Sequence, residues 1–182
     1  SFVGPMYSGK TAAMINMYNR IWNKENVMCF KPKTDTRDMG IIKSRDYEEG
    51  IPAICINSLE ELYKYLKPGT KTIFIDEAQL LTGDVRVLIY FSVYKNIDIY
   101  LAGLNMTSEQ KPFGIMPNIM AVSDAVEMIY GVCYDCNKLA PYTYYDGEKD
   151  TDVLVGNANY MPLCANCLYK RRMNKKLELK IK

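Results

Sequence analysis

A stretch near the start of the chain constrains the fold more than any other feature. Residues 4–11 read Gly-Pro-Met-Tyr-Ser-Gly-Lys-Thr, which matches the G-x-x-x-x-G-K-[ST] pattern of a phosphate-binding loop. Gly4 and Gly9 have no Cβ, so the backbone turns tightly and brings its N–H groups close to phosphate oxygens. Lys10 supplies a cation for the β- and γ-phosphates, and Thr11 supplies a hydroxyl for Mg²⁺. We therefore expect a phosphate-loop fold, with a chance match as the alternative.

The flanks of this loop fit a strand before it and a helix after it. Phe2 and Val3 resemble the end of a strand, and apolar residues recur at helical spacing from Lys10 to about Asn23. The dipole of such a helix favours anions at its first residues. The first strand of this kind of fold normally begins earlier, so we expect further residues before Ser1.

Predicted strands and helices alternate along the next part of the chain. Apolar runs bounded by turn residues predict strands at 27–30, 52–56, 72–75, 97–102 and 125–132, and helices at 58–66, 84–94 and shortly after 114. Ser58 and Glu61 form a predicted capping box at the start of one helix. Residues 33–50 and 104–114 are predicted loops. The alternation indicates an α/β fold, with a mostly parallel sheet and helices on both faces.

A β-branched and aromatic run, residues 72–75, ends in the two carboxylates Asp76 and Glu77. A strand here delivers Asp76 to its carboxyl end, where open α/β sheets bind ligands. In phosphate-loop proteins an aspartate at this position helps to hold Mg²⁺. The alternative is a strand followed by the acidic start of a helix. Because a phosphate loop is also present, we favour a magnesium site.

Four of the six cysteines form two C-x-x-C pairs, which predict a metal site at Cys133, Cys136, Cys164 and Cys167. Each pair brings two thiolates to one side of a tight turn, and two such turns complete a tetrahedral site for structural Zn²⁺. A redox pair and free buried thiols are the alternatives. Four sulfur ligands leave no coordination position open, so we expect no metal catalysis. The other two cysteines lie in apolar strands and are predicted core residues.

Composition limits the remaining function classes. The 182 residues, 48% of them hydrophobic, suffice for one domain with a small appendage, and the net charge of +2 argues against a nucleic-acid partner. The chain has no histidine, which excludes histidine acid–base chemistry and histidine metal ligands. No apolar stretch is long enough to span a membrane and no secretory signal is visible. We therefore expect a cytoplasmic protein without a membrane partner.

The motifs and the composition together predict three regions. Residues 1–132 form an ATP-binding α/β domain, and residues 133–172 form a small zinc-ribbon-like domain. Residues 173–182 belong to a basic tail that begins at about Lys170. We favour a disordered tail over a phosphate-contacting arm.

In this order, the motifs resemble those of the zinc-containing thymidine kinases, the type that includes the human cytosolic enzyme and many bacterial and phage enzymes. The resemblance covers nearly the whole chain. It rests on the Gly-Pro-Met form of the loop, Asp35-Thr36-Arg37, Ile75-Asp76-Glu77-Ala78-Gln79, Lys111-Pro112-Phe113-Gly114 and the two C-x-x-C pairs. It implies ATP-dependent phosphorylation of the 5′-hydroxyl of thymidine to thymidine monophosphate. It also implies a lasso loop that closes over thymidine, and a homotetramer.

The resemblance further implies roles for individual residues. Glu77 matches the catalytic base, and Asp35 and Arg37 match a pair beside the triphosphate and Mg²⁺. The ATP and Mg²⁺ site then comprises Gly4, Pro5, Met6, Tyr7, Ser8, Gly9, Lys10, Thr11, Asp35, Arg37, Asp76 and Gln79. The thymidine site comprises Met6, Leu80, Leu104, Ser108, Phe113, Thr143 and, in the lasso, Leu154, Val155, Gly156 and Tyr160.

Elementary chemistry also favours Glu77 as the base. Phosphoryl transfer needs positioning and charge neutralisation more than covalent chemistry, and Lys10, Arg37, the loop amides and Mg²⁺ supply the neutralisation. The acceptor alcohol must still lose its proton, and in a chain without histidine a carboxylate beside the metal is the natural base. Asp76 is engaged with Mg²⁺, so Glu77 is the better candidate.

Three positions depart from the family pattern. Ser108 stands where a substrate-facing aromatic is usual, the lasso has one residue fewer than usual before Tyr160, and Ala165 follows Cys164 where an arginine is common. The first two changes bear on nucleoside affinity and specificity. A family member with relaxed specificity or lost activity is therefore one alternative. A phosphate-loop ATPase or switch whose zinc ribbon binds nucleic acid is another, although it leaves the Gly-Pro-Met loop unexplained.

Overall fold

A parallel β-sheet forms the centre of the protein. The computed structural model describes residues 1–45, 47, 49–147 and 159–181, with the side chains of residues 176–181 left aside. In this part of the chain the central sheet has six strands in the order β5-β2-β6-β7-β1-β8, and every pair of neighbours is parallel. The strands are β1 (Phe2–Val3), β2 (Val27–Pro32), β5 (Ile54–Ile56), β6 (Thr72–Ile75), β7 (Asp98–Gly103) and β8 (Glu127–Met128).

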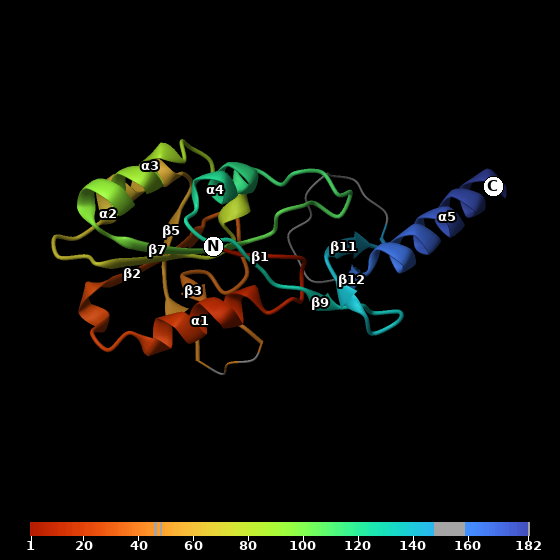
Figure 1. Ribbon diagram of the computed structural model, residues 1–182, viewed down its shortest axis with the longest axis horizontal. Coiled ribbons are helices and arrows are strands. Elements are labelled where there is room, and N and C mark those ends of the chain that lie inside the picture. The colour runs from red at the N-terminus through yellow and green to blue at the C-terminus, as the bar shows by residue number, and fades with distance from the viewer. Residues whose placement is uncertain (46, 48, 148–158, 182) are drawn as a thin grey trace.

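Helices cover both faces of this sheet, as predicted (Figure 1). Helix α1 (Lys10–Arg20) lies on one face, and α2 (Leu62–Tyr65), α3 (Arg86–Ile89) and α4 (Met116–Val122) lie on the other. The alternation of side chains along β6 explains the two cores, since Phe74 packs on the α1 side while Ile73 and Ile75 pack on the opposite side. The predicted α/β class is confirmed.

The shorter helical elements differ in detail from the prediction. They are η1 (Lys24–Asn26), η2 (Leu59–Glu61), η3 (Ala78–Leu80) and η4 (Tyr90–Tyr94). The predicted helix at 84–94 is α3 followed by the π-helical turn η4. The predicted capping box is not formed. The Ser58 side chain makes no capping hydrogen bond, and the Glu61 carboxylate instead accepts one from the backbone N–H of Asn57 at 2.8 Å.

The segment predicted as one long loop, residues 33–50, contains regular structure. Strand β3 (Ile41–Ile42) pairs antiparallel with β4 (Ile51–Pro52). We call the segment 41–52 the ribbon. The predicted strand at 52–56 is therefore divided, because Pro52 belongs to the ribbon and β5 begins at Ile54. Ile42 and Ile51 are buried against the α1 side of the sheet, which fixes the base of the ribbon there.

A second, smaller unit follows β8. The predicted strand at 125–132 is split, because β9 (Gly131–Val132) leaves the sheet and pairs antiparallel with β10 (Leu139–Ala140). Strand β11 (Tyr142–Tyr145) then pairs antiparallel with β12 (Tyr160–Leu163). The exact domain boundaries stay a prediction.

The C-terminal segment is helical in the structure. Helix α5 spans Ala165–Ile181 and extends away from the sheet (Figure 1). The disordered tail predicted at residues 173–182 therefore differs from the structure, in which helix continues through residue 181. Lysine, leucine and glutamate, which dominate this stretch, are good helix formers. Among the described residues, no helix is both long and apolar enough to cross a membrane.

Candidate active site

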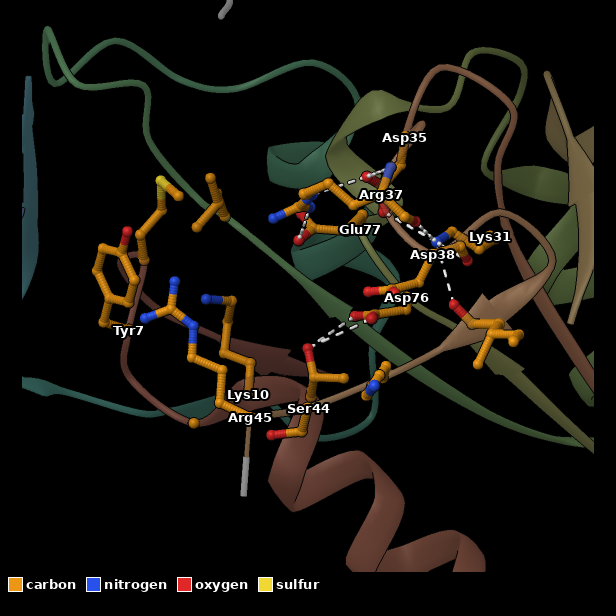
Figure 2. Close-up of a pocket in the computed structure, with 16 residues that line it drawn as sticks. Tyr7, Lys10, Lys31, Asp35, Arg37, Asp38, Ser44, Arg45, Asp76 and Glu77 are labelled. Carbon is orange, nitrogen blue, oxygen red and sulfur yellow. Dashed lines mark hydrogen bonds and ion pairs between the residues drawn. The ribbon is translucent and has the colours of Figure 1, made fainter. Parts of the chain in front are cut away.

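A cavity of about 660 Å³ opens where the phosphate loop meets the carboxyl ends of β2 and β6. Figure 2 shows that side chains from the loop, the ribbon and both strand ends point toward one another across it. Its lining comprises Met6, Tyr7, Gly9, Lys10, Thr11, Lys31, Asp35, Arg37, Asp38, Ile41, Lys43, Ser44, Arg45, Asp76, Glu77 and Leu104. Ten of the predicted site residues are thereby brought together: Met6, Tyr7, Gly9, Lys10, Thr11, Asp35, Arg37, Asp76, Glu77 and Leu104.

Two glycines and internal hydrogen bonds fix the conformation of the phosphate loop. A Cβ on Gly4 would lie 2.0 Å from the carbonyl oxygen of Ile129, so only glycine allows this approach. Gly9 has φ of 86°, which glycine adopts without strain. The Lys10 ammonium is buried and donates to the Pro5 carbonyl at 2.6 Å, and the Ser8 hydroxyl donates to the same oxygen at 2.9 Å. Burial lowers the pKa of Lys10, against the opposing effect of the nearby Glu77 carboxylate.

Asp76 lies at the end of β6, directly beside the start of α1. The Thr11 hydroxyl is 3.3 Å from both oxygens of the Asp76 carboxylate. Burial, and after it the adjacent carboxylate of Glu77, raise the pKa of Asp76 to about 7. A cation at this position would favour the ionised form. Hydroxyl and carboxylate oxygens are also the donor set that Mg²⁺ prefers.

Glu77 is fixed by two partners and by its backbone. Its φ of 49° is in the left-handed region, which is uncommon for a residue with a Cβ and is typical of functional sites. Oε1 accepts from Arg37 Nη2 at 2.7 Å, and Oε2 accepts from Gln79 Nε2 at 2.5 Å. The amide oxygen of Gln79 in turn accepts from the backbone N–H of Leu104 at 3.0 Å. Gln79 therefore holds the Glu77 carboxylate in place without lining the cavity itself.

Asp35 and Arg37 form an ion pair that a third residue supports. Arg37 Nε donates to Asp35 Oδ1 at 2.8 Å. Lys31 Nζ lies 3.2 Å from Asp35 Oδ2 and donates to the carbonyl oxygens of Arg37, Asp38 and Ile41. Burial opposes ionisation of Asp35, but the hydrogen bonds and charges of Arg37 and Lys31 outweigh it and lower the pKa. Sequence reasoning missed Lys31, because its partners lie in a segment that was predicted to be a loop.

The four predicted metal ligands converge at one point of the second unit. The Sγ atoms of Cys133, Cys136, Cys164 and Cys167 all lie within 4.8 Å of one another. Such a set of four thiols fits the tetrahedral sulfur coordination of a structural zinc site. The remaining cysteines, Cys29 and Cys55, lie in β2 and β5.

Comparison with known proteins agrees with this arrangement. The family model for thymidine kinase matches residues 1–168. The chain belongs to the thymidine kinase family. The thymidine kinase of Mycoplasma genitalium is 34% identical over 161 residues, which cover 85% of this chain and 75% of the relative. The thymidine kinase of Pseudothermotoga lettingae is 30% identical and covers 92% of both chains. That of Porphyromonas gingivalis is 32% identical over 92% of this chain and 82% of the relative. The predicted family, and with it the prediction of a kinase, is confirmed.

The described residues that were predicted for the nucleoside site come from the phosphate loop, η3, the loop after β7, β11 and β12. Thr143 Oγ1 accepts from the backbone N–H of Met6 at 2.9 Å, which joins the second unit to the phosphate loop. Leu80 and Phe113 are half-buried outside the cavity lining, and Tyr160 packs against Tyr145 with ring centroids 4.8 Å apart. The predicted lasso residues Leu154, Val155 and Gly156 lie outside the described residues.

Gln110 is a second residue that sequence reasoning missed. Its Nε2 donates to the carbonyl oxygens of Ser108 at 2.7 Å and Thr143 at 3.2 Å. Gln110 therefore links the loop that carries Ser108 to β11. The side-chain Oε1 of Gln110 is buried and has no hydrogen-bond partner among the described residues. No sequence pattern marks this contact, because its partner lies on a strand far along the chain.

Proposed function

We propose that the protein transfers the γ-phosphoryl group of ATP to the 5′-hydroxyl of thymidine, giving thymidine monophosphate for deoxynucleoside salvage. Family membership supports the acceptor. The observation that carries the rest is one cavity that holds both a phosphate loop and the fixed carboxylate of Glu77. A nucleotide bound by the loop would place its terminal phosphate in the same cavity as the carboxylate that deprotonates the acceptor.

In this proposal the loop amides, Lys10 and Arg37 neutralise the phosphates, with Pro5, Tyr7 and Ser8 shaping the loop. Thr11 and Asp76 would hold Mg²⁺, which supplies charge neutralisation when bound. Asp35 orients Arg37 through their 2.8 Å contact. The arrangement needs no covalent intermediate, because positioning and electrostatics carry phosphoryl transfer.

Glu77 is proposed as the general base that takes the proton of the 5′-hydroxyl. The chain contains no histidine to do this. Asp76 already pairs with Thr11 and belongs to the proposed metal site. The contacts from Arg37 and Gln79 hold the Glu77 carboxylate in one orientation, which a base requires.

The thymine base is proposed to lie among Met6, Leu80, Leu104, Ser108, Phe113 and Thr143, with the lasso residues Leu154, Val155, Gly156 and Tyr160 closing over it. The loop from Leu104 to Phe113 reaches the cavity at Leu104, which lines it, and reaches β11 through the hydrogen bond from Gln110 to Thr143. This connection supports a nucleoside site beside the phosphate loop.

Introducing an aromatic ring at Ser108 tests the acceptor pocket. A ring that packs on the base contributes about 1–3 kcal/mol. Ser108→Phe is therefore expected to lower KM for thymidine by about fivefold or more, since about 1.4 kcal/mol is one decade. The value of kcat should change much less, because the contact is equal in ground and transition states. Steady-state kinetics give both constants, and KM for ATP serves as the internal control. An unchanged or raised KM for thymidine would place Ser108 away from the substrate.

The cysteine cluster is proposed to hold one structural Zn²⁺ that keeps the second unit folded and takes no part in the chemistry. A homotetramer and a cytoplasmic location are proposed from the family resemblance. Neither bears on the phosphoryl-transfer chemistry.

The experiment that tests the proposed function is phosphoryl transfer from ATP to a panel of nucleosides, with and without Mg²⁺. We expect thymidine to be phosphorylated in a Mg²⁺-dependent reaction. Activity on several pyrimidine nucleosides at similar rates would indicate relaxed specificity. No transfer to any nucleoside would refute the proposal, and salt-sensitive DNA binding with ATP hydrolysis would then favour a nucleic-acid-dependent ATPase.

A further inference from the structure

The ribbon places a second arginine at the phosphate cavity. Lys43, Ser44 and Arg45 follow β3 and line the cavity. Figure 2 shows the Arg45 side chain next to Tyr7. Ile42 and Ile51 are buried on the α1 side of the sheet and fix the base of the ribbon, so Arg45 lies three residues beyond a fixed position. The guanidinium of Arg45 lies over the ring of Tyr7, with Cζ 4.5 Å from the ring centroid. Tyr7 belongs to the phosphate loop itself.

The charges around the cavity set Arg45 apart from its neighbours. Arg37 is paired with Asp35 and Glu77, and Lys31 is paired with Asp35. The buried ammonium of Lys10 donates to oxygens of the loop. Arg45 and Lys43, in contrast, have no ion pair with a carboxylate among the residues that the structure describes, and the Arg45 guanidinium lies on the face of an aromatic ring. A stacked guanidinium keeps the donors along its edge available for an anion.

We propose that Arg45 binds the terminal phosphate of the donor nucleotide. The proposal rests on the proposed function, which makes that donor ATP. The terminal phosphate carries the largest share of the charge on a triphosphate, roughly −2 at neutral pH. Among the phosphate groups of ATP, the terminal one therefore attracts most strongly a cation that has no carboxylate partner. Tyr7 acts as the platform that orients the planar guanidinium, and the fork of donors matches phosphate oxygens in a bidentate contact.

The consequence is selectivity for a triphosphate over a diphosphate. The loop amides bind phosphates that ATP and ADP share, and Lys10 reaches both the β- and the γ-phosphate, whereas Arg45 contacts only the group that the triphosphate alone has. Arg45 lies in the segment 33–50, which the sequence predicted to be one long loop and for which it indicated no position in space. The ribbon and the contact with Tyr7 supply that position.

Binding measurements without any nucleoside test the proposal. Arg45→Met removes the charge while keeping an unbranched side chain. Its affinity for the magnesium complex of the non-hydrolysable β,γ-imido analogue of ATP should fall by about tenfold or more, as expected for lost charge-assisted hydrogen bonds. Its affinity for the magnesium complex of ADP should change by less than about twofold. Arg45→Lys keeps the charge but loses the fork, so it should recover part of the loss. Calorimetric titration gives all of these values.

Arg86→Met is the matched control, because it removes one arginine charge from α3, where the side chain is 84% exposed and pairs with Asp84. It should leave both affinities unchanged. Equal weakening of the analogue and ADP by Arg45→Met would overturn the proposal, and so would no weakening or the same loss in Arg86→Met. Because no nucleoside is present, these outcomes are separate from the nucleoside panel. A protein that fails to phosphorylate thymidine can still show the Arg45 effect.

Discussion

Glu77→Gln is expected to lower kcat for thymidine phosphorylation by about a hundredfold or more, while ATP and thymidine still bind. Glutamine has nearly the same shape but cannot accept the proton of the 5′-hydroxyl. Its carbonyl oxygen can still accept from Arg37 Nη2, which contacts Oε1 at 2.7 Å in the structure. Its amide nitrogen would then meet the Nε2 donor of Gln79. A local adjustment at Gln79 is expected, so both binding constants should be measured beside kcat.

Two variants complete this experiment. Glu25→Gln makes the same chemical change at an exposed residue far from the cavity and should retain full activity. Asp76→Asn should behave differently from Glu77→Gln, because it removes a charge from the proposed metal site and should raise the Mg²⁺ concentration needed for activity. A Glu77→Gln enzyme with near-normal kcat would exclude Glu77 as the base.

Cys133→Ser is expected to abolish stoichiometric zinc binding and to unfold the second unit. The unit has a small core, since the buried cluster found among its described residues is Cys133, Ala140, Tyr144, Leu163, Cys167 and Leu168. Two of these six are proposed metal ligands, so we expect metal binding and folding to be one process here. The parallel sheet has its own two cores and should stay folded. Thymidine affinity should therefore fall more than ATP affinity.

Zinc analysis of protein purified without chelator should give one ion per chain for the natural sequence and much less for Cys133→Ser. Hydrogen exchange should show lost protection in β9 to β12 and retained protection in β2, β6 and β7. Cys55→Ser is the matched control, because it changes a thiol in β5 and should leave the zinc content unchanged. Natural protein without zinc, or with a disulfide between Cys133 and Cys136, would refute a zinc site.

Local patterns predicted the parts of this protein that depend on local chemistry. The phosphate loop, the run into Asp76 and the two C-x-x-C pairs each specify a short backbone arrangement through residue types a few positions apart. The strand and helix alternation followed from periodicity, and it led to the correct fold class. These features could be predicted because the residues that form each of them are close together in the sequence as well as in space.

The features that the sequence did not reveal depend on distant partners. The ribbon strands are two residues each, too short for a periodic signal, and Ile42 and Ile51 are buried by packing with distant residues on the α1 side of the sheet. Lys31 and Gln110 look like ordinary polar residues until their carbonyl partners are known. The break between β8 and β9 follows from tertiary pairing, since β9 finds its partner in β10.

The hydrogen bond from the Met6 amide to Thr143 Oγ1 joins residues 137 positions apart. One end belongs to the loop that receives the phosphates and the other to the strand beside the proposed acceptor pocket. Ordering either end therefore lowers the entropic cost of ordering the other. Linkage requires the effect to be reciprocal, so bound ATP should raise the affinity for thymidine by the same factor by which thymidine raises the affinity for ATP. The affinity measured for either substrate alone would then be lower than its affinity in the presence of the other substrate. The concentration of each substrate needed for saturation should therefore fall when the other is present.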